Sequence, residues 1–293
     1  MKKISCLFLT CFVFLFESFS AEKAITSLPK LHIATFNIRI QTPSDTAACS
    51  WNRRKTDVAK IIKQYNFDIF GVQEIANRKQ EADLKELIPA YTYIGKGRDN
   101  NQGTTGEQIG IFFKTSRFKL RNTGFFFLSE TPDTMSMGWD GAFRRICVWA
   151  HLYDRQSKRA FFFFSTHFDH IGTKARTESS KLIVERIKIL AGEAPVFCVG
   201  DLNASPESTE MYKNLTSYLE DSREISVTPV KGSSGTFNGY DMLSSSFNEQ
   251  VRIDYIFCRK VQVYNYMVLT EKFTKDCYPS DHFPVMIECN ISK

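Results

Sequence analysis

The stretch that says most about the fold is VFCVGDLN, residues Val196–Asn203. It begins with a continuous apolar run, which is typical of a strand that is covered on both faces. The run ends at Asp201 and Asn203, two polar side chains at the point where a strand gives way to a loop. Scaffolds commonly present their functional side chains at strand ends. This stretch therefore predicts a buried strand with candidate functional residues at its end.

Short apolar runs of the same kind recur along the chain and predict eleven strands in all. The most apolar run contains four consecutive phenylalanines, Phe161–Phe164, which we interpret as core filling rather than as a binding patch. The strand candidates are Leu31–Ile38, Ile69–Val72, Tyr91–Ile94, Ile109–Lys114, Gly124–Leu128, Phe143–Leu152, Phe161–His167, Val196–Gly200, Arg252–Phe257, Tyr264–Leu269 and Pro284–Cys289.

Helical periodicity appears between some of these runs. Apolar residues recur with helical spacing over Arg53–Tyr65 and Arg176–Ala191. Two shorter stripes cover Leu84–Ile88 and Met211–Leu219. Many strands and fewer helices, mixed along the chain, predict an α/β fold with layers around stacked sheets. The pattern does not determine the order of the strands.

The first twenty residues have the pattern of a secretory signal peptide. Lys2–Lys3 form a basic start, Ile4–Phe16 is almost wholly apolar, and Ser18–Ala21 offers small residues for cleavage. We therefore expect a signal peptide at residues 1–20, a single domain at residues 21–293, and export to the periplasm or the extracellular space. The alternative is an uncleaved N-terminal anchor, although the apolar run is short for a membrane span.

Charge and cysteine content narrow the functional classes. The formal net charge of +6 is spread along the chain, so it suits an anionic substrate without selecting nucleic acid. The cysteines form no C-x-x-C pair and the chain has no H-E-x-x-H helix, which argues against zinc chemistry. No disulfide is assigned. Four cysteines in apolar runs are interpreted as buried free thiols: Cys147, Cys198, Cys258 and Cys289.

The polar residues that could carry chemistry share one position, the end of an apolar run. Any one of them could be an ordinary turn residue, but the set suits a hydrolytic metal site. Glu74 and Asp281 can offer carboxylates to Mg²⁺, and Asn37 can offer a neutral oxygen or position a ligand. Asp201, Asn203 and two histidines can supply a base for water, donors to developing charge and help for a leaving group. The full set is Asn37, Glu74, His167, Asp169, Asp201, Asn203, Asp254, Asp281 and His282.

Six short segments, taken in order, resemble the motifs of the endonuclease/exonuclease/phosphatase superfamily. That superfamily includes deoxyribonuclease-like enzymes, abasic-site endonucleases, deadenylases, sphingomyelinases and inositol polyphosphate 5-phosphatases. The resemblance spans roughly residues 31–290, which is nearly the whole chain after the predicted signal peptide. The segments are ATFNIR (34–39), GVQE (71–74), STHFDH (165–170), VGDLN (199–203), IDYIF (253–257) and SDHFPV (280–285).

The resemblance implies a four-layer sandwich, in which two mixed β-sheets pack face to face with helices on the outer faces. It also implies that Glu74 is the principal Mg²⁺ ligand, with Asn37 and Asp281 nearby. In the same way, Asp201 would orient or deprotonate the attacking water, and Asn203 would donate to the phosphoryl oxygens.

The two histidines of the motifs would flank the scissile phosphate. Asp254 would hold one nitrogen of His282 and fix its tautomer. Glu107 looks like the carboxylate that partners His167 in the deoxyribonuclease branch, and its alternative is an ordinary loop residue.

Further residues are candidates for binding the substrate. The segment Met137–Arg145 resembles one in uncharacterised bacterial members of the superfamily. Its last residue, Arg145, could clamp a phosphate or could be an ordinary charged residue where a strand starts. Trp139, in the same segment, could stack on a base or a sugar, or belong to the core or rim. His170 lies just past the His167 motif. Trp51–Arg54 is interpreted as the start of the first helix rather than as a phosphate site.

The resemblance implies a Mg²⁺-dependent phosphoesterase, with Mn²⁺ as a substitute metal, and the predicted signal peptide implies that it is exported. We expect in-line attack of water on a phosphodiester, as in nucleases and phosphodiesterases, and the alternative substrate is a phosphomonoester such as a sugar phosphate. A non-catalytic binding module on the same fold is the alternative of another class, and the intact motif set argues against it.

The expected partner is a phosphorylated substrate, which could be nucleic acid, a nucleotide, a sugar phosphate or a phospholipid headgroup. No obligatory protein partner is evident, and a monomer is expected. Short basic clusters at Lys96–Arg98, Arg117–Arg121 and Lys174–Arg176 are interpreted as solvated surface rather than as a nucleic-acid track.

Overall fold

The computed structural model describes residues 29–76, 78–99, 106–207, 209–240 and 251–292. The predicted signal peptide at residues 1–20 lies outside these ranges. Within them, no helix combines the length and the apolar character that crossing a membrane requires.

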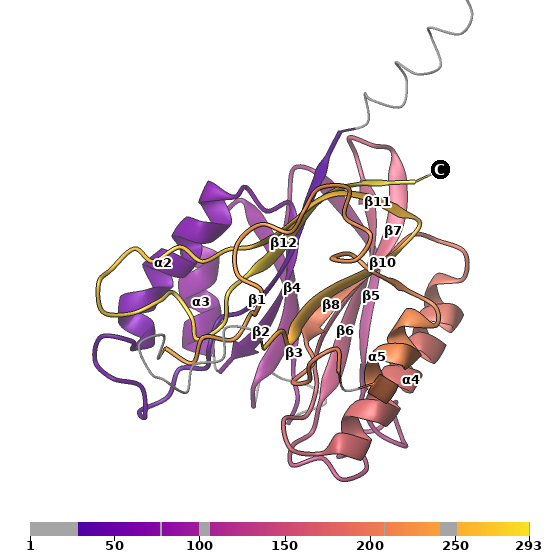
Figure 1. The fold of residues 1–293 in the computed structure, drawn as a ribbon, viewed down its shortest axis with the longest axis horizontal. Coiled ribbons are helices and arrows are strands. Elements are labelled where there is room, and N and C mark those ends of the chain that lie inside the picture. The colour runs from indigo at the N-terminus through magenta and orange to yellow at the C-terminus, as the bar shows by residue number, and fades with distance from the viewer. Residues whose placement is uncertain (1–28, 77, 100–105, 208, 241–250, 293) are drawn as a thin grey trace, which may run out of the picture.

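The described strands form two six-stranded sheets (Figure 1). The first sheet has the order β11-β12-β1-β2-β4-β3, and its pairing is antiparallel except between β1 and β2. Its strands are β1 (Leu31–Asn37), β2 (Ile69–Ile75), β3 (Tyr91–Gly97), β4 (Gln108–Lys114), β11 (Val261–Val268) and β12 (Val285–Ile291).

The second sheet has the order β5-β6-β7-β8-β10-β9, and its pairing is antiparallel except between β7 and β8. Its strands are β5 (Phe118–Phe127), β6 (Ile146–Asp154), β7 (Arg159–His167), β8 (Val196–Asp201), β9 (Glu220–Asp221) and β10 (Asp254–Arg259).

Helices cover the outer face of each sheet. α2 (Trp51–Gln64) and α3 (Arg78–Leu87) lie on the first sheet, and α4 (Thr173–Ala191) and α5 (Thr209–Thr216) lie on the second (Figure 1). One apolar cluster fills the space between the sheets, and another lies under each helical layer. The predicted four-layer α/β sandwich is confirmed.

The phenylalanine run shows how one strand serves two cores. Phe161 and Phe163 belong to the cluster between the sheets, whereas Phe162 and Phe164 belong to the cluster under α4 and α5. Successive side chains of a strand point to opposite faces, so a strand that is covered on both faces needs an apolar residue at every position. The prediction that this run fills the core is confirmed.

Each sheet has its parallel pair at the centre, and a helix connects the two strands of each pair. The carboxyl ends of parallel strands meet at the same edge of a sheet, where ligands commonly bind. The register places Asn37 beside Gln73 in the first sheet and His167 beside Asp201 in the second. β10 adds Asp254 opposite Asp201. The polar residues at the strand ends are therefore gathered at one edge of the sandwich.

Each of the eleven predicted strand segments overlaps an observed strand, but some boundaries differ. β6 begins at Ile146 rather than Phe143, because the residues before it turn toward Asp169, whose Oδ2 accepts the backbone N–H of Phe143. β5 begins at Phe118, six residues before the predicted start. The two-residue strand β9 was not predicted, since a segment of that length has no periodicity.

A disulfide joins Cys49, in the loop before α2, to Cys277, in the segment before β12. The sequence alone left this pair unassigned. The four cysteines predicted to be buried free thiols are free and buried.

Candidate active site

A cavity of about 480 Å³ lies at the edge of the sandwich where the central strands end. Asn37 and Asp254 lie behind its wall and hydrogen-bond to residues that line it. Trp139 does not line the cavity, so the structure does not support the prediction that it stacks on a substrate there. The predicted site residues that line the cavity are Glu74, Glu107, Arg145, His167, His170, Asp201, Asn203, Asp281 and His282.

Three polar side chains from β1, β2 and β8 form the centre of the site. Asn37 Nδ2 donates to Glu74 Oε1 at 2.9 Å and to Asp201 Oδ2 at 3.0 Å. Asn37 Oδ1 accepts the backbone N–H of Arg39 at 3.0 Å, so the amide nitrogen, not the oxygen, faces the two carboxylates. Of the two roles predicted for Asn37, this arrangement corresponds to positioning a ligand.

The backbone is strained around these carboxylates. Arg39, Glu74 and Asn203 have φ angles of 62°, 64° and 48°, and a non-glycine residue in this left-handed region costs roughly 1–3 kcal/mol. Local hydrogen bonds hold the strained residues in place. Glu74 Oε2 accepts the backbone N–H of Ile40 at 2.8 Å, and Asp201 Oδ1 accepts that of Asn203 at 2.9 Å. Strain of this kind concentrates at functional sites, where it fixes the direction of a side chain.

His282 forms a buried pair with Asp254. Its Nδ1 lies 2.9 Å from Asp254 Oδ2, and its Nε2 lies 3.4 Å from Asn37 Nδ2, whose two N–H groups go to Glu74 and Asp201, and 3.7 Å from Asp201 Oδ2. Burial alone lowers the pKa of His282, but the Asp254 and Asp201 carboxylates outweigh it and hold this pKa well above its usual range. Burial raises the pKa of Asp254 to about 6. At neutral pH His282 is therefore a protonated imidazolium with Nε2–H toward Asp201.

His167 forms a second pair, with Glu107. Its Nδ1 lies 2.9 Å from Glu107 Oε1, and its Nε2 lies 3.0 Å from Asn203 Nδ2 and 3.4 Å from Asp201 Oδ2. Asn203 Nδ2 also donates to the carbonyl of Phe168 at 3.0 Å, which identifies it as the amide nitrogen. Because this nitrogen can only donate, His167 Nε2 accepts from it, and Nδ1–H donates to Glu107.

Two guanidinium groups lie beside Glu107. Arg98 Nη1 is 3.1 Å from Glu107 Oε2, and Arg145 Nη1 is 3.6 Å from Glu107 Oε1. Burial raises the pKa of Glu107, but His167 and the two arginines outweigh burial and lower it to about 2. Glu107 is therefore a fixed anion that orients His167.

Asp281 and Arg39 form the opposite rim. Arg39 Nη1 lies 3.2 Å from Asp281 Oδ2, and Arg39 Nη2 lies 3.2 Å from Asp45. Burial raises the pKa of Asp281, and the nearby Glu74 carboxylate raises it further, against the opposing effect of His282. The mutual repulsion of Glu74 and Asp281 marks a locally negative region in which a cation would be stabilised.

The donor set fits a divalent cation. Ligand atoms of Glu74, His167 and Asp201 lie within 4.8 Å of one another, and those of Asp201, Asp254 and His282 do the same. Asp281, a predicted ligand, belongs to neither group of the described residues. Carboxylate oxygens are the ligands that hard divalent cations prefer. Glu74 and Asp201 are therefore the oxygen donors best placed for a metal.

His170 and Arg145 lie together on one wall. Arg145 Nη2 is 3.3 Å from His170 Nδ1, and the His170 ring stacks on Phe143 with centroids 5.6 Å apart. Burial and the Arg145 charge both lower the pKa of His170. Trp139 lies outside this wall because its loop is bound to α4, where the backbone N–H groups of Lys174 and Ala175 donate to Asp140.

Several residues that line the cavity were missed from the sequence. Arg98 was interpreted as solvated surface, yet its side chain is only 12% exposed and is ion-paired to Glu107. Arg39 is the last residue of the first motif, which was the one available signal. Phe143 was predicted only as the start of a strand, and Phe237 carried no signal, since an isolated phenylalanine is ordinarily core.

Arg54 confirms a different expectation. It is buried, and it donates to the backbone carbonyls of Ile38, Cys49 and Pro279. α2 begins at Trp51, as the Trp51–Arg54 segment predicted. Arg54 therefore supports the loops around the site and does not line the cavity.

Known proteins resemble this chain over nearly its whole length. An endonuclease/exonuclease/phosphatase family protein from Bacteroides thetaiotaomicron is 38% identical, with a TM-score of 0.83, over 89% of this chain and 97% of that one. The mannosyl-6-phosphatase of Bacteroides thetaiotaomicron VPI-5482 is also 38% identical, with a TM-score of 0.82, over 89% of this chain and 99% of that one. An uncharacterized protein of Acanthamoeba polyphaga mimivirus is 26% identical over 81% of this chain and 91% of its own length.

The model of the Endonuclease/Exonuclease/phosphatase family matches residues 34–282. This range contains five of the six motifs complete, and the sixth up to His282. The chain belongs to the endonuclease/exonuclease/phosphatase family of phosphoester-hydrolysing enzymes.

Proposed function

We propose that this chain is an exported, Mg²⁺-dependent phosphoesterase that releases phosphate from a phosphomonoester of a small molecule, such as a sugar phosphate. One observation carries the proposal: two histidine–carboxylate pairs face the buried Asp201 carboxylate, beside Glu74, in a single cavity. This arrangement places an acid, a base and oxygen donors for a metal around one small space.

Mg²⁺ is the proposed metal because the available donors are carboxylate oxygens, and Mn²⁺ would serve as a substitute. Glu74 would hold it, which leaves the Asp201 carboxylate free to accept a proton. When bound, it would polarise a phosphoryl oxygen and neutralise charge that develops on the phosphate.

Asp201 and His282 would move the protons of the reaction. Asp201 accepts a proton from the attacking water, and Asn203 donates a hydrogen bond to a phosphoryl oxygen. As the bond between phosphorus and the leaving oxygen breaks, His282 Nε2–H protonates that oxygen. Asp201 then loses its proton to solvent, and solvent restores the proton on His282. Inorganic phosphate and an alcohol are the products, and both side chains end as they began.

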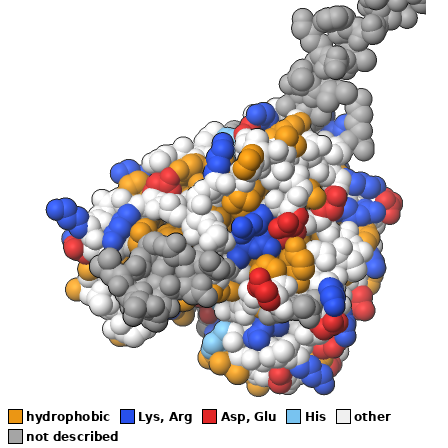
Figure 2. Space-filling view, in the orientation of Figure 1, with side chains coloured by type: hydrophobic (Ala, Val, Ile, Leu, Met, Phe, Trp, Pro, Cys, Tyr) orange, Lys and Arg blue, Asp and Glu red, His pale blue; other side chains and the backbone are white. Residues whose placement is uncertain are grey.

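The sequence predicted a phosphodiester first and a phosphomonoester second, and two observations favour the reverse order. The cavity has the volume of a small-molecule site. On the face drawn in Figure 2, basic side chains are mixed with acidic ones rather than gathered into a band. Similarity to a mannosyl-6-phosphatase at 38% identity supports a sugar phosphate. A phosphodiester is the second candidate, favoured by the several guanidinium groups on the cavity wall.

The disulfide supports export. Disulfides form and persist in oxidising compartments such as the periplasm and the extracellular space. The Cys49–Cys277 bond is consistent with the predicted signal peptide at residues 1–20. We propose that the exported chain acts as a monomer.

The test is phosphate release by purified protein from mannose 6-phosphate, glycerol 3-phosphate and bis(p-nitrophenyl) phosphate, with Mg²⁺ and with EDTA. The proposal expects hydrolysis of a monoester that requires Mg²⁺ and is lost in Glu74→Gln. Hydrolysis of the diester alone would favour the second candidate. Inactivity on every ester would contradict the proposed function.

A further inference from the structure

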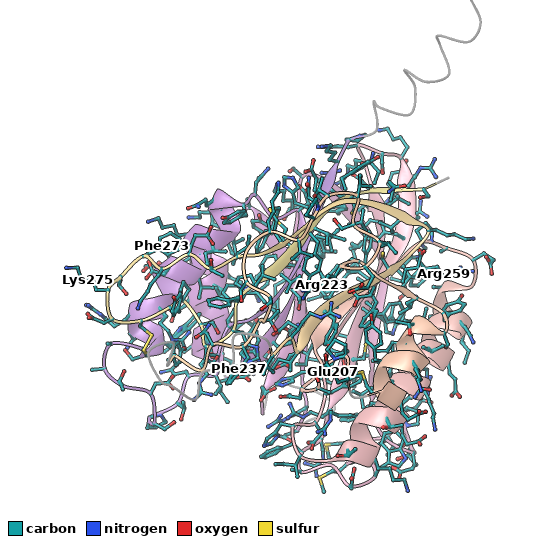
Figure 3. The ribbon with its side chains drawn as sticks, viewed as in Figure 1. Glu207, Arg223, Phe237, Arg259, Phe273 and Lys275 are labelled. Carbon is teal, nitrogen blue, oxygen red and sulfur yellow. A yellow bond between two sulfur atoms is a disulfide. The ribbon has the colours of Figure 1, made fainter. Side chains whose placement is uncertain are left out.

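One wall of the cavity exposes an aromatic ring. Phe143 is 46% exposed and lines the cavity, whereas most large apolar side chains of the described residues are buried. Phe237, 38% exposed, also lines the cavity and contacts His282 with ring centroids 5.0 Å apart. Figure 3 places Phe237 where loops gather at the ends of the strands. An exposed ring in a polar cavity loses the free energy of burial unless a ligand covers it.

Contacts on three sides hold Phe143 in place. Its backbone N–H donates to Asp169 Oδ2 at 3.1 Å, and its ring stacks on His170 at an interplanar angle of 20°. The Arg98 guanidinium carbon lies 4.6 Å from the ring centroid. Stacking and cation–π contacts of this kind fix the orientation of an aromatic ring. Phe143 is therefore preorganised rather than a mobile surface side chain.

Unused hydrogen-bond donors lie beside this ring. Arg98 Nε is buried and has no hydrogen-bond partner among the described residues, and the buried Arg145 Nε has only an ion-pair contact of 3.6 Å, to Asp169 Oδ2. Both guanidinium groups are fixed by Glu107. Buried N–H groups without a partner are costly. Both arginines line the cavity, so a ligand with hydroxyl groups along one edge can accept hydrogen bonds from their guanidinium groups.

The position of Phe143 relative to the reacting phosphate follows from its contacts. His167 is hydrogen-bonded to Glu107, which also pairs with Arg145. Arg145 in turn contacts His170, and the Phe143 ring stacks on the His170 ring. Phe143 thus lies on the Glu107 side of the cavity.

We propose that Phe143, with Arg98 and Arg145, forms a subsite for the ring of a sugar phosphate. The apolar face of a pyranose lies on Phe143, and its hydroxyl edge accepts hydrogen bonds from the guanidinium groups. A sugar ring combines an apolar face with a polar edge, as this wall requires. The inference rests on the proposed phosphomonoesterase function and assigns residues of the same site to the sugar ring of its substrate.

The experiment compares a cyclic and an acyclic substrate. Steady-state phosphate release is measured with mannose 6-phosphate and with glycerol 3-phosphate, in Mg²⁺, for the wild type, Phe143→Ala and Phe143→Leu. Ile171→Ala is the matched control, because Ile171 is 63% exposed, is bonded to the same Asp169 side chain and does not line the cavity. Thermal melting checks the fold, and Phe143→Leu keeps apolar volume if Phe143→Ala does not fold.

We expect Phe143→Ala to lower kcat/KM for mannose 6-phosphate by about tenfold, chiefly through KM, as the loss of an aromatic contact predicts. Glycerol 3-phosphate turnover and inhibition by inorganic phosphate should not change, and Ile171→Ala should behave as the wild type. Equal losses on both esters, or no loss on either, would overturn the subsite while leaving the proposed function in place. Inactivity of the wild type on both esters would overturn the two together.

Discussion

The two histidine–carboxylate pairs of the site are alike in geometry and different in their surroundings. In each pair Nδ1 lies 2.9 Å from a carboxylate oxygen and Nε2 faces Asp201. Two arginines accompany Glu107, the partner of His167, and the pKa of Glu107 falls to about 2. Asp254, the partner of His282, has no guanidinium paired with it among the described residues, and burial raises its pKa to about 6.

This difference indicates that the groups around the carboxylate decide what each histidine does. The negative charge of Glu107 is already compensated by arginines, and His167 Nε2 acts as an acceptor. Asp254 and Asp201 have His282 as their shared cation, so His282 holds a proton that it can donate. Enzymes obtain an acid and a base at one pH by placing similar groups in different environments. The predictions below test this contrast.

The largest expected effect is that of His282→Ala. Removal of a general acid costs about 10²–10⁴ in rate, so we expect kcat to fall by about a thousandfold while Mg²⁺ binding is retained. Asp254→Asn should be less severe, and the double variant should be far from additive because the two residues act as a unit. Steady-state turnover and thermal melting provide the measurements. Full activity in folded His282→Ala would refute the acid assignment.

Glu74→Gln should have the next largest effect. Because Glu74 belongs to neither histidine–carboxylate pair, its loss should not affect one pair more than the other. The two carboxylate oxygens accept N–H groups of Asn37 and Ile40, so the amide keeps the size of the side chain but loses one acceptor and weakens the metal site. We expect roughly a hundredfold lower turnover, from the loss of charge stabilisation by the metal. Calorimetric titration with Mg²⁺ should show weaker binding. Wild-type affinity and rate in this variant would remove Glu74 from the site.

The disulfide supports the His282 pair in particular. Cys277 lies four residues before Asp281, whereas no disulfide of the described residues reaches the His167 side. The variant with both Cys49→Ser and Cys277→Ser should lose roughly 2–5 kcal/mol of stability. Denaturant unfolding with and without reductant is the measurement. Reductant should lower the free energy of unfolding of the wild type and leave that of the double variant unchanged. Equal changes in the two proteins would contradict a stabilising role of the disulfide.

The smallest expected effect concerns acid stability. The folded-state pKa of Glu107 lies below its ordinary value of 4.5, at about 2. Its contribution to stability is therefore fully present above pH 4.5 and is lost as the pH falls toward 2. The difference in melting temperature between the wild type and Glu107→Gln should be largest above pH 5 and should shrink toward pH 3. A difference that stays constant over this range would show that Glu107 is not a fixed anion.

Sequence patterns predicted the layers and most of the site, because apolar runs and the polar residues that close them are local features. Glu74, Asp201 and His282 were identified on that basis. Arg98 was missed, since its ion pair with Glu107 depends on how β3 and β4 lie together. The Cys49–Cys277 pair spans 228 residues and has no local signal. Trp139 was misplaced because the capping of α4 by Asp140 turns its loop away from the cavity.

The most direct test of the contrast between the two pairs is the dependence of rate on the leaving group. An alkyl phosphate such as mannose 6-phosphate needs protonation of its leaving oxygen, whereas p-nitrophenyl phosphate releases a stable anion without it. The values of kcat for both esters are compared in the wild type, His282→Ala and His167→Ala. The account predicts that His282→Ala loses far more activity on the alkyl ester than on the aryl ester, and that His167→Ala loses the same on both. Equal losses in His282→Ala, or a selective loss in His167→Ala, would contradict it.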